Sequence, residues 1–63
     1  MNFEFYCDYN KNWTWQIVSF SGNPIGRSVV TYATKEACIA AIELIKDDLP
    51  RSRVFDQKDD RWL

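Results

Sequence analysis

The chain is short, nearly neutral and free of histidine: 63 residues carry eight basic and nine acidic side chains. Such a length holds one small domain at most. A hydrophobic content of 46% excludes an intrinsically disordered chain, and no apolar stretch approaches the roughly 18 residues of a membrane span. The N-terminal residues also lack the order of basic, apolar and small residues that is typical of a signal peptide, so we expect a cytoplasmic protein.

The length also sets a narrow margin of stability. Folding a chain of 7.5 kDa reduces its accessible surface from roughly 10,900 to roughly 4,200 Å². Burial of the apolar part of this area contributes about 100 kcal/mol, whereas ordering the chain costs about 95 kcal/mol. The two terms nearly cancel, so we expect additional support from a disulfide, a metal ion, close packing or a second chain.

The first half of the sequence predicts three strands. Residues 3–8 and 13–20 alternate apolar and polar side chains, which is typical of half-buried strands, and residues 10–12 form the turn between them. A second turn at residues 21–24 leads to a third strand, rich in β-branched side chains, at residues 25–32. Phe3, Phe5 and Cys7 would share one face of the first strand, and Trp13, Trp15 and Ile17 would share one face of the second.

A helix is predicted to begin after Thr34, where the apolar period changes from two to about 3.6 and threonine is a good N-cap. Pro50 ends it, and we expect this proline to push Leu49 out of helical angles. The apolar stripe is wide, so the helix should be covered on more than one side. Its members are Cys38, Ala41, Ile42, Ile45 and Leu49, widened by Ala37, Ala40 and Leu44.

The remaining residues predict a short strand followed by a tail. Residues 52–56 could form the strand, residues 57–61 are strongly polar, and the chain ends on Trp62 and Leu63. The fold class is therefore α+β, a β(3)-α-β unit whose antiparallel sheet packs on one helix. A domain over residues 1–56 would precede a polar C-terminal tail over residues 57–63.

Several short motifs follow one another in a definite order. They are Trp13-x-Trp15-x-Ile17, the Gly22-Asn23 turn, Ser28-x-x-x-Tyr32-x-Thr34-Lys35, Cys38, and Ile42-x-x-Ile45-Lys46. Together they resemble the YegP-like family of small bacterial domains, over about residues 3–55. The sequence departs from that pattern in its Gly-Asn turn, which the family has as Asn-Gly, in the apolar Val29-Val30 pair, and in residues 59–63.

The resemblance implies a homodimer in which two β(3)-α-β units share a sheet and exchange their C-terminal strands. This chain has one such unit, so a second copy would supply the other. The exchanged segment would place Arg51, Arg53, Val54 and Phe55 in the dimer interface. The family offers no established catalytic residue, so none is carried over, and residues 59–63 inherit no role.

The groups that usually serve catalysis or metal binding are missing. There is no histidine to act as a base near neutral pH, and the adjacent carboxylates Asp47-Asp48 and Asp59-Asp60 diverge rather than face each other. Cys7 has no electropositive neighbour, and its wide separation from Cys38 along the chain fits neither a redox pair nor a zinc site. We therefore expect no enzyme, cofactor or metal. Both thiols are predicted to be free and buried, although a disulfide between strand and helix remains geometrically open.

Six residues are candidates for binding a partner: Trp13, Trp15, Tyr32, Arg27, Arg61 and Trp62. The aromatic strands could stack bases, but only Lys11 and Arg27 accompany them, so core and dimer packing is the simpler interpretation. An end such as Arg61-Trp62-Leu63 could anchor in a partner, since arginine and tryptophan are common interface anchors, or could simply pack back or fray.

These observations support the hypothesis that the chain is a small bacterial or phage protein that acts as a non-catalytic, homodimeric interaction module. It would dock an unknown protein partner through its sheet or its tail. One alternative is a nucleic-acid-binding protein that stacks bases on the sheet. That alternative is less favoured, because a pI near 5.1 provides no general attraction for polyanions. Another is a small acidic inhibitor of a bacterial or phage-defence enzyme.

Overall fold

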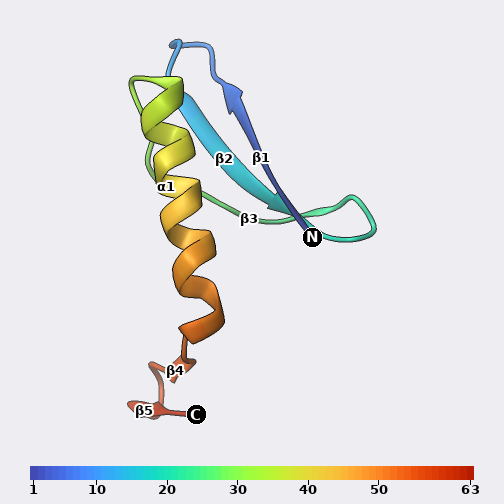
Figure 1. The fold of residues 1–63 in the computed structure, drawn as a ribbon. Helices are drawn as coiled ribbons and strands as arrows, with labels where there is room; N and C mark the ends of the chain where they lie inside the picture. The colour runs from blue at the N-terminus through green and yellow to red at the C-terminus, as the bar shows by residue number, and fades with distance from the viewer.

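The structure, a computed structural model, describes residues 1–63 as an antiparallel three-stranded sheet, one α-helix and a small C-terminal hairpin (Figure 1). The elements are β1 (Asn2–Cys7), β2 (Trp13–Val18), β3 (Pro24–Arg27), α1 (Lys35–Asp48), the 3-10 helix η1 (Leu49–Arg51), β4 (Phe55–Asp56) and β5 (Arg61–Trp62). The predicted α+β class, with three strands before one helix, is confirmed.

The sheet has the strand order β1-β2-β3, and both pairs are antiparallel. The turn between β1 and β2 depends on Asp8, whose carboxylate oxygen Oδ1 accepts hydrogen bonds of 2.9 Å from the backbone N–H groups of Asn10 and Asn12. Lys11 lies between these two residues with a left-handed φ of 62°, and the hydrogen bonds to Asp8 hold the loop in this conformation. Phe5 then faces Trp15 across the pair, and Cys7 faces Trp13.

The third strand is shorter than the sequence predicts. β3 ends at Arg27, and the chain returns to the ladder only at Tyr32, which exchanges backbone hydrogen bonds of 2.7 and 2.8 Å with Trp13. The Ser28 hydroxyl accounts for the interruption, because it donates to the Val30 carbonyl and accepts from the Val30 N–H. Such local bonding of a serine competes with strand pairing.

The helix begins where the sequence predicts. The Thr34 hydroxyl accepts a hydrogen bond of 3.1 Å from the backbone N–H of Ala37 and so caps the first turn. The expected effect of Pro50 on Leu49 is wrong, because Leu49 keeps helical angles of −52° and −42°. Pro50 instead lies in the first turn of η1. The backbone N–H that proline lacks would have no acceptor within the helix at this position, so no hydrogen bond is lost.

The C-terminal segment differs from the predicted polar tail. The strand expected over residues 52–56 begins only at Phe55, and β5 returns to pair with it, so that Phe55 faces Trp62. The Asp56 carboxylate accepts hydrogen bonds from the backbone N–H groups of Lys58 and Asp59, and Asp60 adopts a φ of 53°. These bonds close the loop of the hairpin, in the way that aspartate commonly stabilises turns.

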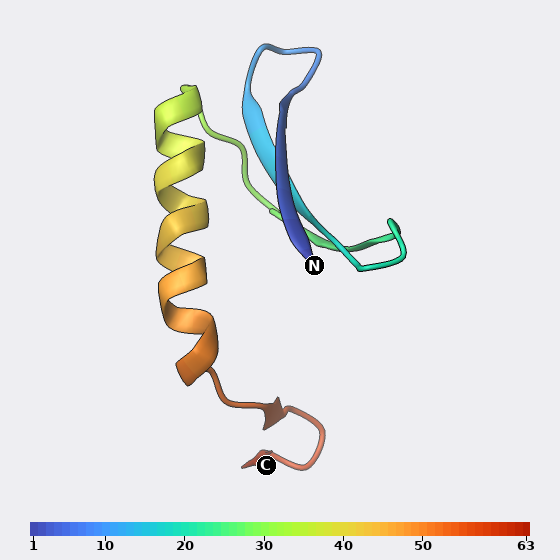
Figure 2. The same cartoon turned by 45° about the vertical axis from the view of Figure 1, so that its right-hand side comes forward.

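The molecule is elongated. In both ribbon views the hairpin lies beyond the C-terminal end of α1, away from the three-stranded sheet (Figure 1, Figure 2). The radius of gyration is 13.8 Å, whereas a compact chain of this length has about 10.6 Å. Only Val18, Cys38 and Ile42 are buried, so the core is very small. None of the helices has the length and apolarity needed to cross a membrane.

Replacement of the N-cap tests this account of the helix. Thr34→Ala should lower the free energy of unfolding by about 1 kcal/mol, because one N–H of the first turn loses its acceptor. Urea denaturation followed by circular dichroism measures the change. Thr31→Ala is the matched control, since the Thr31 side chain makes no hydrogen bond and should tolerate the same truncation. Equal losses in the two variants would contradict the capping role.

Candidate interaction surfaces

The aromatic face of the sheet is turned toward the helix. Phe3 and Phe5 line a groove together with Ile39 and Ile42 of α1, and the Lys35 ammonium lies 5.8 Å from the centre of the Phe5 ring. Strand alternation and the register of β1 with β2 place Trp13 and Trp15 on this same face.

The aromatic rings on this face pack in pairs. The rings of Phe3 and Trp15 meet edge to face with centroids 5.6 Å apart, and those of Phe5 and Trp13 lie 5.9 Å apart. Pairs of this geometry add stabilisation beyond simple burial.

Three of the six candidate binding residues therefore belong to the packing between sheet and helix. Trp13, Trp15 and Tyr32 are each half-buried. The indole N–H of Trp15 is buried without an acceptor, which costs about 1 to 3 kcal/mol. The period-two pattern placed Trp13 and Trp15 on one face of their strand, but only the register with β1 and the position of α1 show that this face is covered.

The basic candidates do not converge. Arg27 lies on β3 beside a shallow hollow lined by Gln16, Pro24 and Gly26. Arg51 donates a hydrogen bond of 2.9 Å to Asp48, and the Arg53 guanidinium lies 4.5 Å from the centre of the Trp62 ring. The arginines near the C-terminus thus belong to the helix end and the hairpin, apart from Arg27 on β3.

An open groove runs between β1 and α1. It has a volume of about 490 Å³, and its lining is mainly apolar. The lining residues are Met1, Asn2, Phe3, Glu4, Phe5, Ile39, Ile42, Glu43 and Lys46. The predicted apolar faces of strand and helix indicated three of these residues, Phe3, Phe5 and Ile42, whereas the other lining residues and the wide opening at this side are visible only in the structure.

The C-terminal hairpin is a second apolar feature. The rings of Phe55 and Trp62 pack edge to face with centroids 4.9 Å apart, and the Leu63 N–H donates to the Val54 carbonyl at 2.9 Å. Trp62 is nevertheless 55% exposed, and Val54 and Leu63 are exposed beside it. Neither β4 nor β5 contacts α1 or any strand of the larger sheet. Apolar side chains in the hairpin therefore lack a covering layer.

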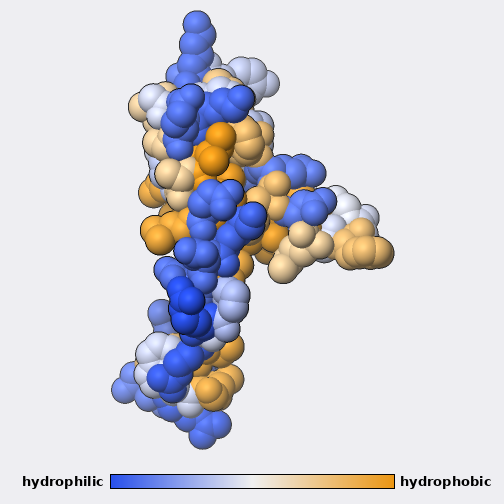
Figure 3. All heavy atoms as spheres, in the orientation of Figure 1, coloured by the Kyte–Doolittle hydropathy of each residue, from blue (hydrophilic) through white to orange (hydrophobic).

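Exposed apolar side chains are unusually frequent elsewhere as well. Tyr9 and Phe20, in the loops at either end of β2, are fully exposed, and so is Val29. The alternating pattern predicts Phe20 at the end of the second strand, but Phe20 falls in a turn in which Gly22 adopts a φ of 92°. The space-filling view shows apolar atoms on the body of the molecule and again on the hairpin (Figure 3).

The two cysteines differ in environment. Both thiols are free, as predicted, but Cys7 is exposed at the end of β1, so the expectation that both are buried is wrong. Cys38 is fully buried against the sheet, and desolvation raises the pKa of its thiol. A raised pKa reduces the thiolate fraction, so Cys38 is a packing residue rather than a nucleophile.

The structure brings together no group of three or more potential metal ligands among cysteine, aspartate and glutamate. Asp48 pairs with Arg51, and Asp56 holds the hairpin loop. Both carboxylates thus have a structural partner.

Comparison with known proteins identifies the fold rather than a role. No family model matches the chain, and no curated protein does. An NMR solution structure of a protein from Haloferax volcanii superposes with a TM-score of 0.76 at 29% sequence identity, covering 87% of this chain and 92% of that one. The small α+β arrangement therefore recurs in a solved structure of nearly the same extent.

The covered position of Trp15 can be tested by truncation. Trp15→Ala should lower the free energy of unfolding by about 3 to 5 kcal/mol, because it removes a large ring from the contact between sheet and helix. Trp15→Phe should cost much less, since it keeps an aromatic ring and removes the unpaired N–H. Phe20→Ala, at a fully exposed aromatic, should change stability by less than about 0.5 kcal/mol. A loss below about 1 kcal/mol for Trp15→Ala would instead assign Trp15 to a binding surface.

Thiol labelling tests the different environments of the cysteines. In the native protein at pH 8, an aromatic disulfide reagent should modify Cys7 within seconds to minutes and leave Cys38 unmodified. Cys38 should react only after unfolding, because its thiol is buried and its raised pKa disfavours the thiolate. The Cys7→Ser variant isolates the Cys38 signal, and rapid native labelling of that variant would refute the buried position.

Proposed function

We propose that the protein is a non-catalytic homodimeric interaction module. The observation that carries this proposal is the excess of exposed surface in a single chain. One protomer exposes 5401 Å², whereas a compact monomer of its mass exposes about 4,200 Å². The difference of about 1,200 Å² exceeds the roughly 800 Å² that each partner buries in a standard interface.

The chemistry of the excess surface supports the same proposal. Fourteen large hydrophobic side chains are exposed and only three residues are buried. Monomeric soluble proteins rarely leave apolar surface of this extent open to water. A second copy that covers the groove and the hairpin would provide the core that the chain lacks alone.

The resemblance to the YegP-like family suggests how the copies associate. We propose that the protein is a single-repeat relative of that family and that its C-terminal strand is exchanged. Arg51, Arg53, Val54 and Phe55, the interface residues that the resemblance implies, are all exposed in the protomer. β4, at the end of their segment, contacts neither the larger sheet nor α1, which leaves it free to join another chain.

Docking of a macromolecular partner would then use the sheet surface that α1 leaves open. This outer face carries Glu4, Tyr6 and Gln16, with Arg27 at its edge and Phe20 on the adjoining loop. The alternative of base stacking loses its main support, because Trp13 and Trp15 face the helix.

The mass in solution tests the dimer directly. Sedimentation equilibrium at micromolar concentration should report twice the 7.5 kDa of one chain. A mass of 7.5 kDa that persists at high micromolar concentration would refute the proposal.

Removal of the C-terminal segment provides an independent test. In an isolated protomer β4 and β5 contact neither the larger sheet nor α1, so truncation after Pro50 would leave thermal unfolding unchanged. In an exchanged dimer the same truncation removes part of each core, and we expect loss of cooperative unfolding. Calorimetry of the full-length and truncated chains distinguishes the two outcomes.

A further inference from the structure

We propose that the groove between β1 and α1 receives the C-terminal hairpin of a second copy, with Trp62 as the anchoring side chain. This inference rests on the proposed dimer and assigns its contact site. It also gives a role to residues 57–63, which the YegP-like resemblance leaves unexplained.

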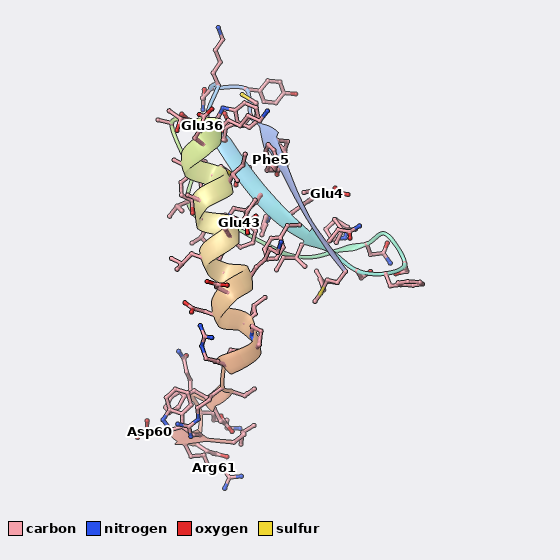
Figure 4. All side chains as sticks on the ribbon, in the orientation of Figure 1. Glu4, Phe5, Glu36, Glu43, Asp60 and Arg61 are labelled. Carbon is pink, nitrogen blue, oxygen red and sulfur yellow. The ribbon has the colours of Figure 1, made fainter.

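The groove has the composition of a binding site for an apolar segment. Phe3 and Phe5 from β1 and Ile39 and Ile42 from α1 provide apolar walls, in a volume of about 490 Å³. This volume lies within the range of ligand-binding clefts in proteins. The stick view labels Phe5 on the strand side and Glu43 on the helix side, and both residues line the groove (Figure 4).

The hairpin is complementary to this groove. The paired rings of Phe55 and Trp62, flanked by Val54 and Leu63, form an apolar surface that contacts no other element of its own chain. Trp62 is the largest side chain in this surface, and its ring packs against Phe55 and the Arg53 guanidinium. A preoriented tryptophan loses little conformational entropy on binding.

Charge also favours the pairing. Arg61 is adjacent to Trp62, and Figure 4 shows it at the far end of the molecule, remote from Glu43 of the same chain. Glu43 at the rim of the groove engages only Lys46, at a distance of 3.9 Å. An arginine at the edge of the docked hairpin would therefore meet a carboxylate, and rim charges of this kind contribute mainly to orientation.

The backbone edges are complementary as well. β1 pairs only with β2, so its outer edge, beside the groove, has no strand partner. β4 likewise pairs only with β5. Exposed strand edges readily accept a further strand from another chain.

The hairpin of the same chain does not occupy its own groove, because neither β4 nor β5 contacts α1 or the larger sheet. The 3-10 helix η1 carries the chain beyond the end of α1, so that Ser52 is roughly 16 Å from the level of Ile42. The groove is therefore open to the hairpin of a second copy, which is the occupant that we propose.

Truncation of the anchor is the first experiment. Trp62→Ala should raise the dissociation constant of the dimer at least about 30-fold in sedimentation velocity, while circular dichroism still reports the helix. Tyr9→Ala is the control, because it removes an equally exposed aromatic side chain in a loop distant from the groove and the hairpin. We expect its dissociation constant to stay within about twofold of the wild-type value.

Disulfide trapping is the second experiment, and it decides the question where Trp62→Ala fails to fold. Two proteins are made in a Cys7→Ser background, one with Glu43→Cys and the other with Arg61→Cys. The two proteins are mixed, unfolded and refolded together so that their subunits exchange, and then mildly oxidised. We expect a covalent species with the mass of two chains in the mixture and little in either protein alone. Asn23→Cys in place of Glu43→Cys should yield none.

The outcomes separate this inference from the dimer itself. A dimeric wild-type mass, an unchanged dissociation constant for Trp62→Ala and no mixed disulfide would overturn the groove assignment and leave the dimer standing. A wild-type mass of 7.5 kDa would overturn both.

Discussion

The contact between one face of α1 and one face of the sheet is the interaction on which the rest of the protomer depends. Cys38 and Ile42 are the only buried residues of the helix, and the aromatic pairs of β1 and β2 lie on the face of the sheet that is turned toward it. A chain of this length gains little beyond the conformational entropy that folding costs. With so small a core, the apolar surface that remains open has a strong tendency to find a second layer.

The groove and the hairpin are complementary parts of that open surface. The groove exists because β1 is the outer strand and α1 does not extend over its free edge, and the hairpin is detached because η1 directs the chain beyond the helix end. Neither part is explained by the packing of one chain. The dimer that we propose would bury both at once, and it leaves the polar outer face of the sheet for a further partner.

The order of the elements and the faces of the strands were predictable because they follow from local chemistry. The alternation around Phe3, Phe5 and Trp15 determines the sheet face, and the hydroxyl of Thr34 determines where the helix starts. The predicted ends of the elements were wrong where a side chain forms a hydrogen bond with the backbone of a nearby residue, or where a proline fits into a helical turn. Ser28 interrupts β3, Asp56 converts the expected tail into a hairpin, and Pro50 extends the helix end as η1. Such local bonds compete with regular structure and leave little trace in an apolar period.

By itself the sequence determined the α+β class, the β-β-β-α order, and the absence of histidine and hence of the commonest catalytic base and metal ligand. Only the tertiary structure decided that Trp13 and Trp15 face the helix, that Cys7 is exposed while Cys38 is buried, and that the arginines do not converge. The reason is physical: periodicity specifies which residues share a face, but burial depends on which element covers that face. In this chain one helix covers one face and leaves the groove and the hairpin open.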